Sequence, residues 1–222
     1  TALGLVCGFY VLRATVDGNA QSTFLWLFTA LVIDSTDGML ARAVDVKHVV
    51  PEYDGRKLDD ITDYLNYVFI PVYFAYRFQL VPPHWDWVLA LPLLASAYGF
   101  CSEAAKTNDG YFTGFPSYWN VLVFYLYILG VKPWAGALLF GYLALMVFWP
   151  VKYLYPSQAP VFRKPLILLT LVWFVAYVFM VFNVHSIPPA LAWGSLAYPA
   201  FYFAFSFWLH FKDDGGQSPA LA

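Results

Sequence analysis

An acidic stretch set between apolar segments constrains this chain more than any other feature. Of the 14 acidic residues, eight lie between positions 33 and 65: Asp34, Asp37, Asp45, Glu52, Asp54, Asp59, Asp60 and Asp63. Sequence of membrane character lies on both sides of the stretch. Because ionisable groups are energetically unfavourable inside a bilayer, carboxylates at such a place indicate a functional site.

The composition is that of a polytopic membrane protein. Of the 222 residues, 61% are hydrophobic and 12% are charged, whereas a soluble domain carries about 25% charged residues. The formal net charge of −2 argues against a nucleic-acid partner. Cys7 and Cys101 lie in separate apolar segments, so neither a disulfide framework nor a zinc site is expected. The chain starts at Thr1 inside an apolar segment, which we interpret as a missing N-terminal piece and not as a cleaved signal peptide.

We predict an all-α fold with about eight transmembrane helices, forming a single domain over residues 1–222. A helix needs about 20 mostly apolar residues to cross a bilayer, and prolines punctuate the joints between the candidates. The predicted segments are 2–16, 22–44, 55–80, 85–105, 117–131, 133–155, 164–185 and 188–212.

The basic residues predict how these segments are oriented. Lys and Arg concentrate on the cytoplasmic side of membrane proteins. If even-numbered segments end on that side, it receives nine of the 12 basic residues: Arg42, Lys47, Arg56, Lys57, Lys106, Lys152, Arg163, Lys164 and Lys212. Arg13, Arg77 and Lys132 then lie opposite. The acidic stretch and both termini are therefore expected in the cytoplasm, as in a multi-pass protein of the bacterial inner membrane.

The spacing within the stretch places its carboxylates in pairs. On a helix, Asp34, Asp37, Gly38 and Ala41 share one face, and Gly55, Asp59 and Asp63 share another. Asp60 lies about 100° from Asp59 and faces elsewhere. Close carboxylates need a countercharge to stay ionised together, and hard divalent cations such as Mg²⁺ and Mn²⁺ prefer oxygen ligands. Glycines beside the pairs leave room for a bulky ligand near the backbone.

The same residues read D-x-x-D-G-x-x-A-R, then twelve residues, 43–54, then G-x-x-x-D-x-x-x-D. This pattern resembles the signature of the CDP-alcohol phosphotransferase family. Most members have eight residues in the central gap, and the longer gap here resembles the bacterial phosphatidylcholine synthase branch. The stretches FLWLFTALVID, DYLNYVFIPVY and KTNDGYFTGFPSYWN are similar to that branch as well, so the resemblance covers nearly the whole chain.

The resemblance implies that an alcohol attacks the β-phosphorus of a CDP-linked lipid and that CMP leaves. It implies two Mn²⁺ or Mg²⁺ ions per site, held by Asp34, Asp37, Asp59 and Asp63. Asp63 would also take the proton of the attacking hydroxyl. The CDP moiety would be bound by Asp37, Gly38, Ala41, Arg42, Gly55 and Asp59. Within this set Arg42 would pair with the pyrophosphate, for which a guanidinium is well shaped.

For this branch the expected substrates are CDP-diacylglycerol and choline, and the expected products phosphatidylcholine and CMP. A quaternary ammonium binds against aromatic faces. Candidates for its pocket are Glu103, Trp119, Asn120, Tyr98, Tyr64, Tyr67 and Tyr125, and Lys106 is placed to reach a phosphate. For each aromatic residue, ordinary packing is an alternative, and Glu103 could instead pair with Lys106.

Three alternatives stay open at this point. Another family member would use serine, inositol or glycerol phosphate as acceptor. An ion transporter would also carry intramembrane carboxylates, although it is expected to show paired interrupted helices. A scaffold with a decayed site would lack motif residues, and none is missing here. Membrane lipid is an expected partner, and members of the family are often homodimers, although the sequence does not determine the oligomeric state of this chain.

Overall fold

The computed structural model describes residues 1–102, 111–154 and 163–214, and these residues are almost entirely helical, as predicted. Its elements are α1 (Leu3–Val16), α2 (Ala20–Ala43), α3 (Val46–Val49), α4 (Gly55–Asp63), the π-helix η1 (Tyr64–Phe69), α5 (Ile70–Arg77), the 3₁₀-helix η2 (Pro83–Leu89), α6 (Ala90–Cys101), β1 (Tyr111–Thr113), α7 (Trp119–Ile128), α8 (Pro133–Phe148), β2 (Lys152–Leu154), α9 (Arg163–Phe182), α10 (Pro189–Ser195) and α11 (Ala197–Asp214). Each of the eight predicted segments contains one or more of these helices.

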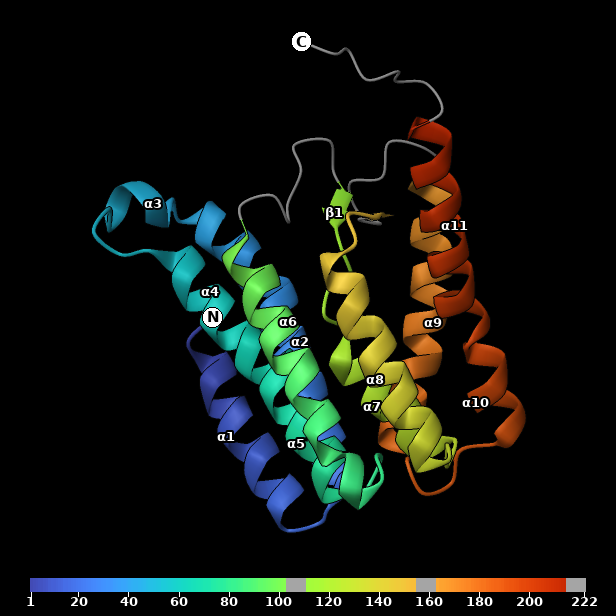
Figure 1. Cartoon of the computed structure of the whole chain (residues 1–222). Helices are drawn as coiled ribbons and strands as arrows, with labels where there is room; N and C mark the ends of the chain where they lie inside the picture. The colour runs from blue at the N-terminus through green and yellow to red at the C-terminus, as the bar shows by residue number, and fades with distance from the viewer. Residues whose placement is uncertain (103–110, 155–162, 215–222) are drawn as a thin grey trace.

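The long helices run side by side and alternate in direction (Figure 1). The connection that carries α3, the strand β1 and the end of α11 gather at one end of the bundle, and the short turns after α1, α5, α7 and α9 gather at the other. The basic residues of the described segments divide between these two ends as predicted. Arg42, Arg56 and Lys164 belong to helix ends on the α3 side, and Arg13 and Arg77 to helix ends on the opposite side.

Among the described residues, two helices are long and apolar enough to cross a membrane, Ala20–Ala43 with 24 residues and Lys164–Phe182 with 19. Shorter apolar helices cover Leu3–Val16, Trp119–Ile128 and Pro133–Phe148. Many large apolar side chains on these helices are exposed, including Leu145, Leu168 and Val175 at 62–68%. Apolar surface of this extent suits contact with lipid better than contact with water.

The third predicted segment is one continuous helix that changes type. α4 passes into the π-helix Tyr64–Phe69, and α5 continues from Ile70. The backbone stays in the right-handed helical region at Asp63, Tyr64 and Ile70. Single-turn π segments inside α-helices occur often at functional sites, and this one begins directly after the last aspartate of the motif.

The end of the sixth segment differs from the prediction. The sixth segment was expected to be helical to residue 155, but α8 ends at Phe148. Pro150 explains the difference, since a residue before proline avoids the helical region, and Trp149 has φ −82° and ψ 121°. The chain beyond it forms β2, which pairs antiparallel with β1 and sets Phe112 opposite Tyr153. This short ladder was not predicted.

Close packing holds α1 against the motif helix. A Cβ atom at Gly4 would lie 2.6 Å from Thr62 Cγ2, and one at Gly8 would lie 2.6 Å from Asn66 Oδ1. Asn66 is buried and donates from Nδ2 to the carbonyl of Gly4 at 3.0 Å. Two small residues four apart let membrane helices approach closely, so α1 supports the part of the chain that carries Asp59 and Asp63.

Candidate active site

Three of the four predicted metal ligands converge. Asp34 projects from α2, Asp59 and Asp63 project from α4, and one carboxylate oxygen of each lies within 4.8 Å of the others. All three side chains are half-buried, and Asp63 Oδ1 is shielded from solvent. Carboxylates this close repel one another when ionised, so a cation stabilises the arrangement.

Local sequence explains why α4 presents its aspartates together. Asp54 caps the helix by accepting from the backbone N–H groups of Arg56 at 3.1 Å and Lys57 at 3.2 Å. The hydrogen bond from the Lys57 backbone, together with the nearby Lys57 ammonium at 3.5 Å, lowers the pKa of Asp54. A helix that begins at Gly55 places Asp59 and Asp63 one turn apart on the same face.

The hydroxyl groups of Ser35 and Thr36, which flank this part of α2, form their hydrogen bonds within the helix itself. The Ser35 hydroxyl donates to the carbonyl of Val32 at 3.0 Å, and the Thr36 hydroxyl donates to the carbonyls of Val32 and Ile33 at 3.0 and 2.9 Å. These bonds let polar residues lie near the end of an apolar helix without a partner from another helix. The Asp34 side chain instead points toward Asp59 and Asp63 of α4 and Tyr67 of η1.

Asp37, the fourth predicted ligand, lies outside the three-carboxylate group. Its Oδ2 accepts a hydrogen bond from the Thr1 hydroxyl. Asp37 is one helical turn beyond Asp34 on α2, so the prediction that both belong to one face is confirmed, while their side chains engage different partners. The cause is a residue far away in the sequence, which spacing alone does not reveal.

The two glycines among the predicted CDP-binding residues, Gly38 and Gly55, differ in the space around them. A Cβ atom at Gly38 would lie 3.3 Å from Arg42 Nη1, so the guanidinium lies over that glycine. A Cβ atom at Gly55 would meet nothing within 4 Å among the described residues. Ala41 and Arg42 are exposed at the end of α2. Open space at Gly55 and a guanidinium beside Gly38 are compatible with a bulky anionic ligand at this end of the two helices.

Most of the predicted choline-pocket residues have packing roles. Trp119 is fully buried, donates from Nε1 to Ser96 Oγ at 2.7 Å and stacks on Phe140. Asn120 beside it is also buried. Trp119 was a candidate for choline binding with packing as the alternative, and its position in the structure is the packed one, because both faces of the fully buried ring are covered by protein.

Tyr125, Tyr64 and Tyr98 are engaged elsewhere too. The Tyr125 hydroxyl donates to Ser195 Oγ at 2.8 Å and accepts from Trp173 Nε1 at 3.0 Å, which joins α7 to α9 and α10. The Tyr64 hydroxyl donates to the carbonyl of Leu93 at 2.9 Å. Tyr98 is 57% exposed and packs against Phe148. Glu103 and Lys106 lie outside the described residues.

Tyr67 differs from the other tyrosines because its hydroxyl reaches the acidic group. It donates to Asp34 Oδ2 at 3.3 Å, from the π-helix to α2. The sequence analysis placed Tyr67 among the candidates for choline binding, and the structure adds a direct contact with a predicted metal ligand. The signal that could have found it is the spacing of Asp59, Asp63 and Tyr67, which recur every four residues.

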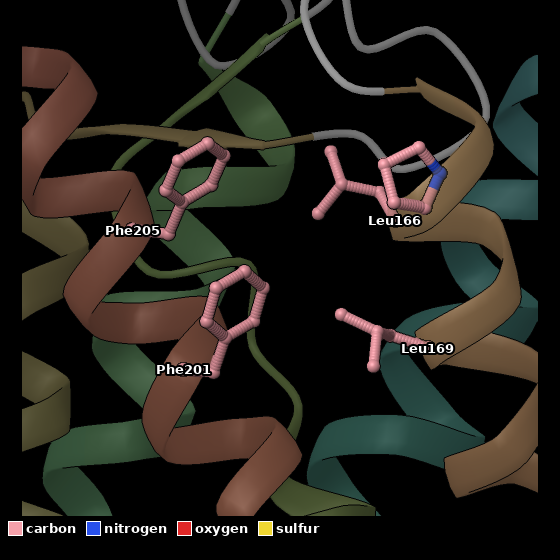
Figure 2. A pocket seen from close by; sticks show the side chains of 5 residues that line it. Leu166, Leu169, Phe201 and Phe205 are labelled. Atoms are coloured by element: carbon pink, nitrogen blue, oxygen red, sulfur yellow. The ribbon is translucent and has the colours of Figure 1, made fainter.

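Two surface cavities lie away from the carboxylates. One, of about 190 Å³, lies between α9 and α11 (Figure 2) and is lined by Pro165, Leu166, Leu169, Phe201 and Phe205. Its lining, drawn from the described residues, is wholly apolar and so offers nothing to orient a phosphate. The other, of about 420 Å³, includes Tyr73, Tyr76, Asp86 and Trp87. Tyr73 is ten residues beyond Asp63, about 15 Å along a helix, which is too far for an attacking hydroxyl.

Comparison with known proteins identifies the family. No family model matches the chain. It is 38% identical over 177 residues to the phosphatidylcholine synthase of Pseudomonas aeruginosa, covering 79% of this chain and 74% of that protein. The chain belongs to the phosphatidylcholine synthase family. The Borreliella burgdorferi phosphatidylcholine synthase is 38% identical over 184 residues, covering 82% of this chain and 79% of that protein.

Membership of the phosphatidylcholine synthase family extends over the whole acidic stretch. The phosphatidylcholine synthase of Rhizobium meliloti is 29% identical over 219 residues, which is 98% of this chain and 91% of that protein. A match of that length includes both halves of the motif and all the helices that position it. The resemblance noted from the motif and its long central gap is thereby confirmed.

Proposed function

We propose that the chain transfers the phosphatidyl group of CDP-diacylglycerol to choline, forming phosphatidylcholine and CMP. The observation that carries the proposal is the convergence of Asp34, Asp59 and Asp63 within 4.8 Å in a member of the phosphatidylcholine synthase family. An all-carboxylate group beside an arginine suits a substrate whose pyrophosphate must be bound through metal ions and a guanidinium.

The donor set fits Mg²⁺ or Mn²⁺. These ions prefer carboxylate oxygens, and Mg²⁺ binds them at about 2.0–2.1 Å, so opposite ligands of one ion lie about 4 Å apart. The three carboxylate oxygens lie within 4.8 Å of one another, which is compatible with that spacing. Asp37, one turn along α2, would complete the set of four aspartates. Bound metal would neutralise charge on the pyrophosphate and on the departing CMP.

The chain's own residues would divide the remaining work. Arg42 would pair with the phosphates of CDP, and the open space at Gly55 would admit the nucleotide. Asp63 would accept the proton of the choline hydroxyl as its oxygen attacks the β-phosphorus. One phosphorus–oxygen bond forms to choline, one breaks to release CMP, and the proton stays on the Asp63 carboxylate. Correct placement of the two substrates supplies much of the rate.

We also propose that the eight helical segments cross the bacterial inner membrane with the acidic group on the cytoplasmic side. The uneven distribution of basic residues supports this orientation. In a background with Cys7 and Cys101 replaced by serine, Glu52→Cys should resist a membrane-impermeant thiol reagent in intact cells, and His84→Cys should react. Labelling of Glu52→Cys but not of His84→Cys would invert the topology.

The acceptor is tested with membranes that contain the chain, CDP-diacylglycerol, Mn²⁺ and a panel of radiolabelled alcohols. We expect choline to be converted to phosphatidylcholine, with ethanolamine, serine, inositol and glycerol phosphate much poorer, and with no product from Asp63→Asn. Turnover of serine, inositol or glycerol phosphate in place of choline would refute choline as the acceptor. It would not contradict the proposed metal-dependent transfer.

A further inference from the structure

The contact between Tyr67 and Asp34 links two elements that the motif itself does not link. Asp34 comes from α2, and Tyr67 comes from the π-helix that follows α4. The Tyr67 hydroxyl donates to Asp34 Oδ2 at 3.3 Å, while a carboxylate oxygen of Asp34 faces those of Asp59 and Asp63. A hydrogen bond to one side of a carboxylate restricts the rotation of the whole group.

The π-helix explains how Tyr67 reaches this position. Along an α-helix, residues at i, i+4 and i+8 drift by about 40° at each step, because each residue advances about 100°. Asp59, Asp63 and Tyr67 have this spacing. The wider turn of Tyr64–Phe69 advances less per residue. The π-helix therefore turns Tyr67 back toward the helix face that carries Asp59, and this face is directed at Asp34 of α2.

We propose that Tyr67 is a positioning residue that holds Asp34 in the orientation that binds the metal, and that the π-helix exists to place it there. The inference rests on the proposed function, since it assigns a role toward the metal of that same site. Groups that hydrogen-bond to metal ligands fix the ligand's orientation, and their loss weakens metal affinity about 10–100-fold. The Tyr67 hydroxyl has this relation to Asp34.

Tyr64 supplies a matched control. It belongs to the same π-helix and is also a half-buried tyrosine, but its hydroxyl donates to the carbonyl of Leu93, away from the acidic group. Replacing either tyrosine by phenylalanine removes one hydroxyl and one hydrogen bond from the same helical turn. Only Tyr67→Phe removes a bond to a predicted metal ligand.

The test is Mn²⁺ binding to the purified full chain in detergent, measured without substrate from the electron paramagnetic resonance signal of free Mn²⁺. Tyr67→Phe should bind Mn²⁺ about 10–100-fold more weakly than the unmodified protein, and Tyr64→Phe should bind it with unchanged affinity. Activity of Tyr67→Phe should recover at high Mn²⁺ concentration, with the choline KM unchanged at saturating metal.

The other outcomes would overturn either the role of Tyr67 or the proposed metal site. Unchanged Mn²⁺ affinity in Tyr67→Phe overturns the inference, as does an equal loss in Tyr64→Phe, which would mark a general effect on the helix. A raised choline KM with unchanged Mn²⁺ affinity would overturn it in favour of a choline contact. If the unmodified protein binds no Mn²⁺, the metal site of the proposed function fails first, before any variant is compared.

Discussion

The carboxylates of the motif and the aromatic residues of α7 were both predicted to form the active site, but they lie in different environments in the structure. Asp34, Asp59 and Asp63 are half-buried and point at one another across two helices. Trp119 and Tyr125 are buried, and their polar atoms are bonded to Ser96, Ser195 and Trp173. The first group brings three carboxylates together, which is the geometry that the proposed cation site needs, and the second group links helices through hydrogen bonds.

The difference shows which kind of sequence evidence is informative in a membrane protein. Intramembrane carboxylates are energetically unfavourable, so three that share a location need a function. Aromatic side chains make up 21% of this chain, and many of them, such as Phe24, Phe74 and Phe124, pack in the core between helices. An aromatic residue near a predicted site is therefore weak evidence for a ligand, even where the ligand is a quaternary ammonium.

Removal of metal, which acts on the carboxylate group, should reduce activity more than any other change. Chelation by EDTA, with residual metal measured, should reduce formation of phosphatidylcholine to background, because the carboxylates bind the pyrophosphate only through cations. Added Mn²⁺ or Mg²⁺ should restore it. Full activity in verified metal-free samples would show that the acidic group serves another purpose.

Asp63→Asn should have the next largest effect. A positioned base contributes about 10²–10⁴-fold to a rate, and Asp63 is also a predicted ligand, so turnover should fall by at least that range. Binding of CDP-diacylglycerol should remain measurable, since the base acts only in the chemical step. Turnover close to that of the unmodified enzyme would contradict the assigned role.

On the aromatic side, Trp119→Ala should affect stability and not recognition of choline. Removing a fully buried tryptophan leaves a cavity and removes the hydrogen bond to Ser96, which corresponds to a loss of about 3–5 kcal/mol. Thermal unfolding in detergent measures the loss. The surviving folded enzyme should keep its choline KM, and a large rise in that KM at unchanged stability would return Trp119 to the binding pocket.

Tyr125→Phe should have the smallest effect. It removes one hydroxyl that joins Ser195 and Trp173, and hydrogen bonds between membrane helices contribute about 0.6 kcal/mol on average. We expect a small fall in unfolding temperature and unchanged kinetics with choline. A selective change in choline kinetics would be evidence for a ligand contact on α7.

The sequence allowed the helices and the acidic group to be predicted because both follow from regular spacing. Asp59 and Asp63 repeat on one helical face, and Asp34 lies in the second half of α2, the long helix that precedes them in the chain. The π-helix could not be predicted in this way, because no residue type or spacing is specific to its wider turn. The position of Asp37 depends on Thr1, 36 residues away, and the end of α8 was missed although Pro150 marks it.

The central claim is that the carboxylates facing one another bind the catalytic metal, and adjacent aspartates test it directly. Asp59 belongs to the three-carboxylate group, and Asp60, the next residue, lies about 100° around the same helix. Synthesis of phosphatidylcholine should be measured against Mn²⁺ concentration for Asp59→Asn and Asp60→Asn. The account predicts that Asp59→Asn is inactive or needs at least tenfold more Mn²⁺, while Asp60→Asn follows the unmodified curve. Equal curves for the two variants would contradict it.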